Sequence, residues 1–213
     1  MPAIRLLVAD DHEMVRAGLV QFLGASPGIE VVCEASSGDD VLKKLRANTI
    51  DLLLLDMSMP GRSGIELIKQ VLSEKPRLRV LILSMHEERQ YAVRAIRAGA
   101  AGYLTKESAS AQLVSVIRKV AAGGAFISTE VAEQLALAAM PQTEGLPHTA
   151  LSDREYQVFQ ALAAGRTVSE IATQLNLSVK TVSTHKARLM QKMSLPNQAE
   201  LVRYALVHKL VDA

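Results

Sequence analysis

The sequence of 213 residues contains no tryptophan, and its few tyrosines and phenylalanines make up only 3% of the chain. A buried core must therefore be built from aliphatic side chains, and a hydrophobic fraction of 49% supplies enough of them. No apolar run approaches the roughly 18 residues that a membrane-spanning helix needs. The N-terminal residues also lack the basic start and cleavage site of a signal peptide. These absences argue against a membrane protein and predict a cytoplasmic one.

Cysteine and net charge are also scarce. Cys33 is the only cysteine, so an intrachain disulfide is excluded and a reducing compartment fits. The formal net charge of +2 indicates no partner by itself, but it is unevenly divided. Residues 148–213 hold eight basic and five acidic groups, whereas residues 1–147 hold 16 basic and 17 acidic groups. This asymmetry permits nucleic-acid binding by the C-terminal part without indicating it alone.

The first 125 residues alternate between apolar, β-branched runs and segments with helical spacing. Such alternation predicts a parallel sheet covered by helices on both faces. Five such units in this length predict an α/β, flavodoxin-like, doubly wound fold, whose functional groups gather at the carboxyl ends of the strands. The five predicted strands are 4–9, 31–35, 52–55, 80–83 and 101–104.

The remainder of the chain divides into a connecting segment and a helical domain. A helical pattern over 128–139 is followed by MPQTEGLPHTA, which has two prolines, a glycine and no periodicity. We therefore predict one domain over 1–125, a linker with a helical segment over 126–147, and a second domain over 148–213.

The second domain shows four helical segments and no strand pattern. Capping boxes are predicted to begin helices at Ser152 and Thr167, because a glutamate follows each hydroxyl residue three positions later. A short break at 176–178 separates a helix over 167–175 from a helix over 179–193. Two helices joined by so tight a turn are typical of a helix-turn-helix.

Acidic residues stand at the ends of two predicted strands. Asp10 and Asp11 end the first strand, and Asp56 ends the third. These ends lie at one edge of a parallel sheet, so the three carboxylates are expected to converge. Ser84 ends the fourth strand and Lys106 follows the fifth, which adds a hydroxyl and a cation. A single aspartate at a strand end could be only a turn former or a helix cap. Three aspartates, a serine and a lysine that all stand at or just after strand ends together favour a functional site.

The predicted cluster suits phosphoryl transfer. Crowded carboxylates repel one another unless a cation lies among them, and Mg²⁺ prefers a few carboxylates together with water and phosphate oxygens. A carboxylate can also act as a nucleophile and form an aspartyl phosphate. A nearby lysine and hydroxyl would neutralise and hydrogen-bond the phosphoryl oxygens.

The segments LVADDHEMVRAGL, LLLLDMSMPGRSGIEL, VLILSMHE and AGAAGYLTKE resemble the receiver domain of two-component response regulators. The resemblance implies that Asp56 accepts a phosphoryl group from a sensor histidine kinase. Asp11, Asp56 and the backbone carbonyl of Ser58 would hold Mg²⁺, with Asp10 acting largely through water. Lys106 would bind the phosphoryl group.

The same resemblance implies two switch residues. Ser84 would move toward the phosphoryl group and Tyr103 would turn inward behind it, although an ordinary packed strand aromatic is the alternative for Tyr103. His12 invites a catalytic role beside the acidic pair, but a helix-start residue without chemistry is favoured. Glu107 stands where many family members have a proline in a cis bond, so a cis bond is not expected there.

The segment LSDREYQVFQALAAGRTVSEIATQLNLSVKTVSTHKARLMQKM resembles the LuxR-type helix-turn-helix domain of NarL/FixJ-type regulators, and the match covers nearly all of 150–212. On the helix over 179–193, an apolar stripe of Val182, Leu189 and Met193 predicts the inward face. Small and polar residues form the opposite face, which would let this helix approach the floor of the DNA major groove.

The resemblance also assigns contacts to this helix. Ser183, Thr184 and Ala187 would face the bases. Contacts to the DNA backbone would come mostly from Lys180, Thr181, Lys186 and Arg188. Lys192 could be a further contact or only a solvated helix-end lysine.

The final helix often pairs two DNA-binding domains in this family. The residues that would make this contact here are Val202, Arg203 and Leu206. A homodimer is therefore expected when the protein is phosphorylated.

These features predict a two-component response regulator, a transcription factor whose phosphorylation on Asp56 controls dimerisation and binding to double-stranded DNA. RNA polymerase could be a further partner, and slow autodephosphorylation would be the only enzymatic activity. The main alternative is a phosphorylation-independent DNA-binding regulator with a vestigial receiver. A metal-dependent phosphatase is disfavoured because Ser58 stands where such enzymes have a second aspartate. A pure interaction module is disfavoured by the helix-turn-helix.

Overall fold

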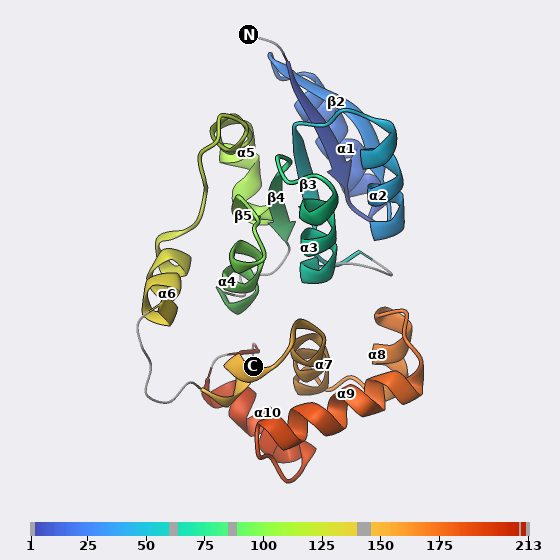
Figure 1. The fold of residues 1–213 in the computed structure, drawn as a ribbon, viewed down its shortest axis with the longest axis vertical. Coiled ribbons are helices and arrows are strands. Elements are labelled where there is room, and N and C mark those ends of the chain that lie inside the picture. Colours follow the sequence, from blue (N-terminus) through green and yellow to red (C-terminus); the bar gives the residue numbers. More distant parts are fainter. Residues whose placement is uncertain (1–2, 60–63, 85–88, 140–145, 209, 212–213) are drawn as a thin grey trace. The chain divides into compact units, whose positions relative to one another are not determined.

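The computed structural model describes residues 3–59, 64–84, 89–139, 146–208 and 210–211. The chain divides into two compact units, Met1–Leu137 and Ala138–Ala213. The first unit contains a sheet with helices, and the described part of the second unit contains helices only (Figure 1). This confirms the predicted combination of an α/β domain and an all-α domain.

All five strands of the sheet are parallel and lie in the spatial order β2-β1-β3-β4-β5. The order reverses between β1 and β3, and the carboxyl ends beside such a reversal are where doubly wound folds bind ligands. The predicted flavodoxin-like topology is therefore confirmed. The strands are β1 (Ile4–Ala9), β2 (Ile29–Ala35), β3 (Leu52–Asp56), β4 (Arg79–Ser84) and β5 (Gly102–Thr105).

Side chains of the strands alternate between two aliphatic cores, one on each face of the sheet. Leu7 and Leu53 belong to the core covered by α2, α3 and α4, whereas Leu6 and Leu54 belong to the core covered by α1 and α5. Both faces are dry, which is why the strands are continuously apolar. The helices are α1 (Glu13–Gly24), α2 (Gly38–Ala47), α3 (Gly64–Glu74), α4 (Arg89–Arg97) and α5 (Lys106–Ala121).

The segment after α5 is joined to the edge of the sheet at β5. The Tyr103 amide donates a hydrogen bond to the Phe126 carbonyl at 3.0 Å, and the Phe126 amide donates to the Ala101 carbonyl at 3.0 Å. A Cβ atom at Gly102 would lie 2.9 Å from the Phe126 carbonyl oxygen. Glycine at position 102 is therefore required for the close approach of the two backbones.

Helix α6 (Thr129–Ala139) lies where the sequence predicts a helix, and it also belongs largely to the first unit. Its Val131 is buried in the same core as Tyr103. Residues 140–145, near the C-terminal end of the predicted linker, lie outside the described part of the chain.

In the described residues from 146 onward, a short 3₁₀ helix, η1 (Pro147–Ala150), precedes four α-helices. Both predicted capping boxes are formed, with Ser152 and Thr167 at the N-caps. The turn after the second α-helix uses Asn176 in the left-handed region at φ 51°, a conformation that asparagine tolerates well. The helices are α7 (Asp153–Ala163), α8 (Val168–Gln174), α9 (Val179–Lys192) and α10 (Gln198–Val207).

A buried glutamate ties the start of α7 to the end of α9. Glu155 Oε2 accepts hydrogen bonds from the Ser152 amide at 2.8 Å and from Lys192 Nζ at 2.6 Å. Burial alone would raise the pKa of Glu155, but the hydrogen bonds from Lys192 and Ser152 outweigh it and lower this pKa below its ordinary value. The ionised carboxylate therefore stabilises the helical frame that holds α9.

We expect Glu155→Gln to destabilise the second unit by about 1.5–3 kcal/mol at neutral pH, because a hydrogen bond to a charged group is lost. The Glu155 pKa is lower in the folded than in the unfolded protein. Its stabilisation is therefore full above the ordinary glutamate pKa and disappears as the pH falls through the folded-state value. Thermal unfolding of both proteins at pH 7 and pH 3.5 should show the difference shrinking in acid. Lys192→Met should reproduce the effect, and a difference that does not vary with pH would contradict it.

Candidate functional site

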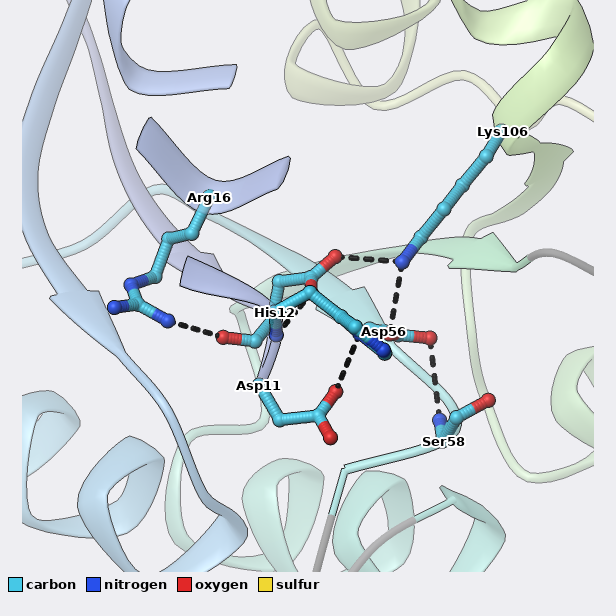
Figure 2. A network of polar contacts seen from close by, with 7 residues as sticks. Asp11, His12, Arg16, Asp56, Ser58 and Lys106 are labelled. Atoms are coloured by element: carbon cyan, nitrogen blue, oxygen red, sulfur yellow. Dashed lines mark hydrogen bonds and ion pairs between the residues drawn. The ribbon is translucent and has the colours of Figure 1, made fainter. Parts of the chain in front are cut away.

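The predicted acidic site forms at the carboxyl ends of β1 and β3. Asp10 follows β1 directly and Asp56 is the last residue of β3, and both side chains are 1% exposed. Lys106 begins α5 immediately after β5. Its Nζ atom donates hydrogen bonds to Asp10 Oδ2 at 2.6 Å and to Asp56 Oδ2 at 2.9 Å (Figure 2). The structure thus brings together these three side chains, as their strand-end positions predict.

The ammonium group of Lys106 forms ion pairs with two buried carboxylates in this cluster. Burial lowers the pKa of Lys106, but its hydrogen bonds to Asp10 and Asp56 outweigh this effect and raise the pKa above its ordinary value. Lys106 is therefore a cation at neutral pH. A single positive charge does not balance three neighbouring carboxylates, so the cluster retains an attraction for another cation.

Asp11 provides an oxygen that is suited to such a cation. Asp11 Oδ1 is shielded from solvent and accepts no hydrogen bond from the described part of the chain. His12 Nδ1 lies 3.1 Å from this oxygen and 3.4 Å from Asp10 Oδ1, and each contact is an ion pair only when the imidazole is protonated.

The donor atoms are close enough to surround one ion. One donor atom each from Asp10, Asp11, His12 and Asp56 lies within 4.8 Å of the others. Three carboxylates are ligands that a hard divalent cation prefers. The unsatisfied Asp11 oxygen and this clustering together show that the residues fit a divalent metal ion.

Of the three remaining predicted receiver residues, Ser58 follows β3, Ser84 ends β4 and Tyr103 lies in β5. The Ser58 amide donates a hydrogen bond to Asp56 Oδ1 at 3.1 Å, which places its backbone beside the carboxylate. Ser84 is buried at the end of β4, where it pairs in register with Thr105 of β5. Tyr103 is buried in the core that also contains residues of α4. Their roles in metal binding and switching stay predictions.

Arg16 belongs to the site and is not predicted from the sequence. Its Nη1 atom donates a hydrogen bond to the Asp10 carbonyl oxygen at 2.7 Å (Figure 2). Its Nε atom donates to Glu34 Oε2 at 3.1 Å. Arg16 therefore connects α1 and β2 to the backbone of an acidic residue. The only local signal is its place one turn after His12, which does not distinguish it from a solvated arginine.

Helix α9 presents the two faces that the sequence predicts. Val182, Leu189 and Met193 are buried. The exposed residues on the opposite side include the five outward-facing residues of the predicted DNA contacts, Lys180, Ser183, Thr184, Ala187 and Arg188.

The other two predicted DNA contacts of α9 are engaged in contacts within the second unit. Lys186 is half-buried, and its Nζ atom donates a hydrogen bond to Gln198 Oε1 of α10 at 2.8 Å. Thr181 is half-buried, and its Oγ1 atom lies 2.7 Å from the Oγ atom of the N-cap Ser178, within hydrogen-bond distance. Both side chains therefore contribute to the fold of this unit, and their contacts with DNA stay predictions.

The residues predicted to pair two DNA-binding domains lie on α10. Leu206 is 45% exposed, and Arg203 is exposed and forms an ion pair with Glu200 at 2.9 Å. Val202 is half-buried. An apolar side chain beside a charged one on a solvent-facing helix suits a contact surface, and dimerisation through it stays a prediction.

Fold and site together define a class of two-domain regulators, with a receiver-like acidic site and a helix-turn-helix domain. Residues 6–118 match the family described as the response regulator receiver domain. Residues 149–205 match the family described as bacterial regulatory proteins of the LuxR family. The chain belongs to the response regulators of the NarL/FixJ type, which combine these two domains.

Relatives match the chain over almost its whole length. The response regulator UvrY of Escherichia coli O6:H1 is 40% identical over 211 residues, which cover 99% of this chain and 97% of UvrY. The response regulator GacA of Pseudomonas viridiflava is 40% identical over 211 residues, covering 99% of each chain. A structure of RcsB from Salmonella typhimurium aligns with a TM-score of 0.72 at 27% identity, covering 96% of this chain and 97% of RcsB. Among the described residues, no helix is long and apolar enough to cross a membrane.

Replacing Lys106 should strengthen divalent cation binding. Lys106→Met removes a positive charge that lies within 3 Å of both buried carboxylates, so the cluster becomes more negative. We expect MgCl₂ to raise the unfolding temperature of this variant more than it raises that of the wild type. Lys75→Met, which replaces an exposed lysine after α3, is the matched control. An equal response of all three proteins to MgCl₂ would show that Lys106 does not compete with the ion.

Proposed function

We propose that Asp56 accepts a phosphoryl group from a sensor histidine kinase, and that this phosphorylation controls dimerisation and DNA binding by the second unit. The observation that carries the proposal is the Lys106 ammonium shared between Asp56 and Asp10 at the reversal point of the sheet. This arrangement supports a nucleophilic carboxylate with a cation already beside the position that a phosphoryl group would occupy.

Asp56 attacks the phosphorus of a phosphohistidine, so that a new O–P bond forms while the P–N bond breaks and the imidazole leaves. Asp11, Asp56 and the Ser58 carbonyl would hold Mg²⁺, with Asp10 acting largely through water. The ion would neutralise charge on the phosphoryl oxygens. Lys106 is near enough to exchange its contact with Asp56 for one with the phosphoryl group.

The receiver can pass this change to α6 through β5. Lys106 directly follows β5, and Ser84 pairs with Thr105 in register. Two residues before Thr105, the Tyr103 amide is hydrogen-bonded to Phe126, the residue that leads into α6. A phosphoryl group carries about −1.5 to −2 charges near neutral pH, so recruitment of Ser84 and Lys106 would shift β5 and the position of Tyr103. The result is a population shift between two states that reaches the linker.

For the second unit we propose that the exposed face of α9 enters the DNA major groove. Ser183, Thr184 and Ala187 would approach the bases, while Lys180 and Arg188 would bind phosphates. Solved structures show RcsB in complex with DNA, and one of them contains two RcsB dimers on two DNAs.

Pairing through Val202, Arg203 and Leu206 would let two half-sites add their binding free energies.

We place this regulator in the cytoplasm and infer no enzymatic activity beyond slow loss of its own phosphoryl group.

The central experiment treats the full chain with acetyl phosphate and Mg²⁺ and compares wild type with Asp56→Ala. We expect the wild type to gain one phosphoryl group by intact mass and to bind DNA from a pool of duplexes more tightly, while Asp56→Ala does neither. Asp39→Ala, at an exposed position in the first turn of α2, is the matched control and should behave as wild type. If the wild type gains no phosphoryl group yet binds specific DNA equally well, the receiver is a scaffold and the phosphorylation-independent alternative replaces this proposal.

Variants of α9 should separate DNA contacts from contacts that hold the fold. Arg188→Ala is expected to weaken binding to all duplexes and to reduce the slope of log affinity against log salt by about one. Thr184→Ala should instead weaken binding by about 0.5–1.5 kcal/mol, the value of one ordinary hydrogen bond, and only for the preferred sequence. Lys186→Ala should mainly lower thermal stability, because Lys186 is bound to Gln198. Fluorescence anisotropy over a range of salt concentrations measures these effects, and an unchanged salt slope for Arg188→Ala would contradict the assignment.

A further inference from the structure

His12 occupies the N-cap of α1 without acting as a cap. Within the described chain its side chain makes no capping hydrogen bond, whereas Ser37, Thr167 and Ser178 accept hydrogen bonds from the first turns of α2, α8 and α9. A serine, threonine, aspartate or asparagine at an N-cap contributes about 1 kcal/mol relative to alanine. The start of the helix therefore gives no reason for an imidazole at this position.

The imidazole instead faces the acidic cluster. His12 Nδ1 lies 3.1 Å from Asp11 Oδ1 and 3.4 Å from Asp10 Oδ1. The His12 amide donates a hydrogen bond to Asp10 Oδ1 at 2.8 Å, which holds the backbone of this residue beside the cluster. Two neighbouring ligands of an octahedral ion, each at about 2.1 Å, are about 3 Å apart. The separation of Asp11 Oδ1 and His12 Nδ1 therefore matches that of two adjacent ligands as well as that of a hydrogen bond.

The donor atoms of Asp10, Asp11, Asp56 and His12 include a nitrogen, whereas a site specific for Mg²⁺ would offer oxygen atoms only. Mg²⁺ takes oxygen ligands almost entirely, whereas an imidazole nitrogen favours divalent transition-metal ions. We propose that His12 Nδ1 is a nitrogen ligand that makes the acidic site bind divalent transition-metal ions in preference to Mg²⁺. The proposal rests on the proposed function in one respect, namely that Asp11 and Asp56 hold the receiver's divalent ion.

Mn²⁺ is the probe of choice, because its free form is counted by electron paramagnetic resonance and a bound imidazole nitrogen couples to its spin. The full chain would be titrated with Mn²⁺ alone and in competition with Mg²⁺. Wild type would be compared with His12→Ala and with His12→Asn, which offers an oxygen ligand and a good N-cap. We expect the preference for Mn²⁺ over Mg²⁺ to fall in both variants, with nitrogen coupling lost and Mg²⁺ affinity nearly unchanged.

Asp56→Asn separates failure of this inference from failure of the site itself. If Asp56→Asn abolishes binding of both ions, but wild type and His12→Ala share one metal preference and neither shows nitrogen coupling, His12 is not a ligand and the acidic site stands. If Asp56→Asn leaves binding of both ions unchanged, the ions bind elsewhere, and both the inference and the metal site of the proposed function are wrong.

Discussion

The ammonium of Lys106 holds the receiver site together, because it satisfies two buried carboxylates that would otherwise repel each other in a poorly solvated place. Lys106 lies 96 positions after Asp10 and 50 positions after Asp56 in the chain, and its contacts connect the ends of β1 and β3 to the start of α5. Removing one partner of such a buried group is costly, since a charge remains without compensation. The same contact makes Lys106 available to an anion that forms on Asp56. A contact that stabilises the resting site is thus also the one that a phosphoryl group would rearrange.

The amino and the carboxyl ends of the strands have different roles. At the amino ends of the strands, Arg5 and Asp51 form a two-pronged ion pair. Arg79 donates hydrogen bonds to the carbonyl oxygens of Val120, in the last turn of α5, and of Gly123 and Gly124, just after that helix. The Arg5–Asp51 pair is neutral as a whole, and Arg79 satisfies carbonyl oxygens at the end of α5 and just after it. At the carboxyl end, acidic oxygens outnumber cations. The contacts at the amino ends of the strands therefore support the structure, whereas the excess of carboxylates at the carboxyl ends allows that side of the sheet to bind a cation and to react.

Lysine side chains of α9 divide their work in a similar way. Lys192 binds Glu155 of α7 and Lys186 binds Gln198 of α10, so this helix is connected to its neighbours by polar contacts as well as by its apolar stripe. Its exposed face keeps small and polar side chains together with Lys180 and Arg188. A helix held firmly by its neighbours keeps its outward side chains in fixed relative positions, which sequence readout of DNA requires.

Local patterns in the sequence determined much of this protein. The continuously apolar strands, the capping boxes at Ser152 and Thr167, the acids at strand ends and the inward stripe of α9 were all predictable, because each depends on residues a few positions apart. Only the tertiary structure showed that Lys106 serves two carboxylates, that Arg16 holds the Asp10 backbone, that Lys186 turns toward α10, and that Phe126 lies against Gly102. Those contacts depend on strand register and on the rotamers of long side chains that meet across many residues. Spacing along the chain carries no information about either, so packing alone decided them.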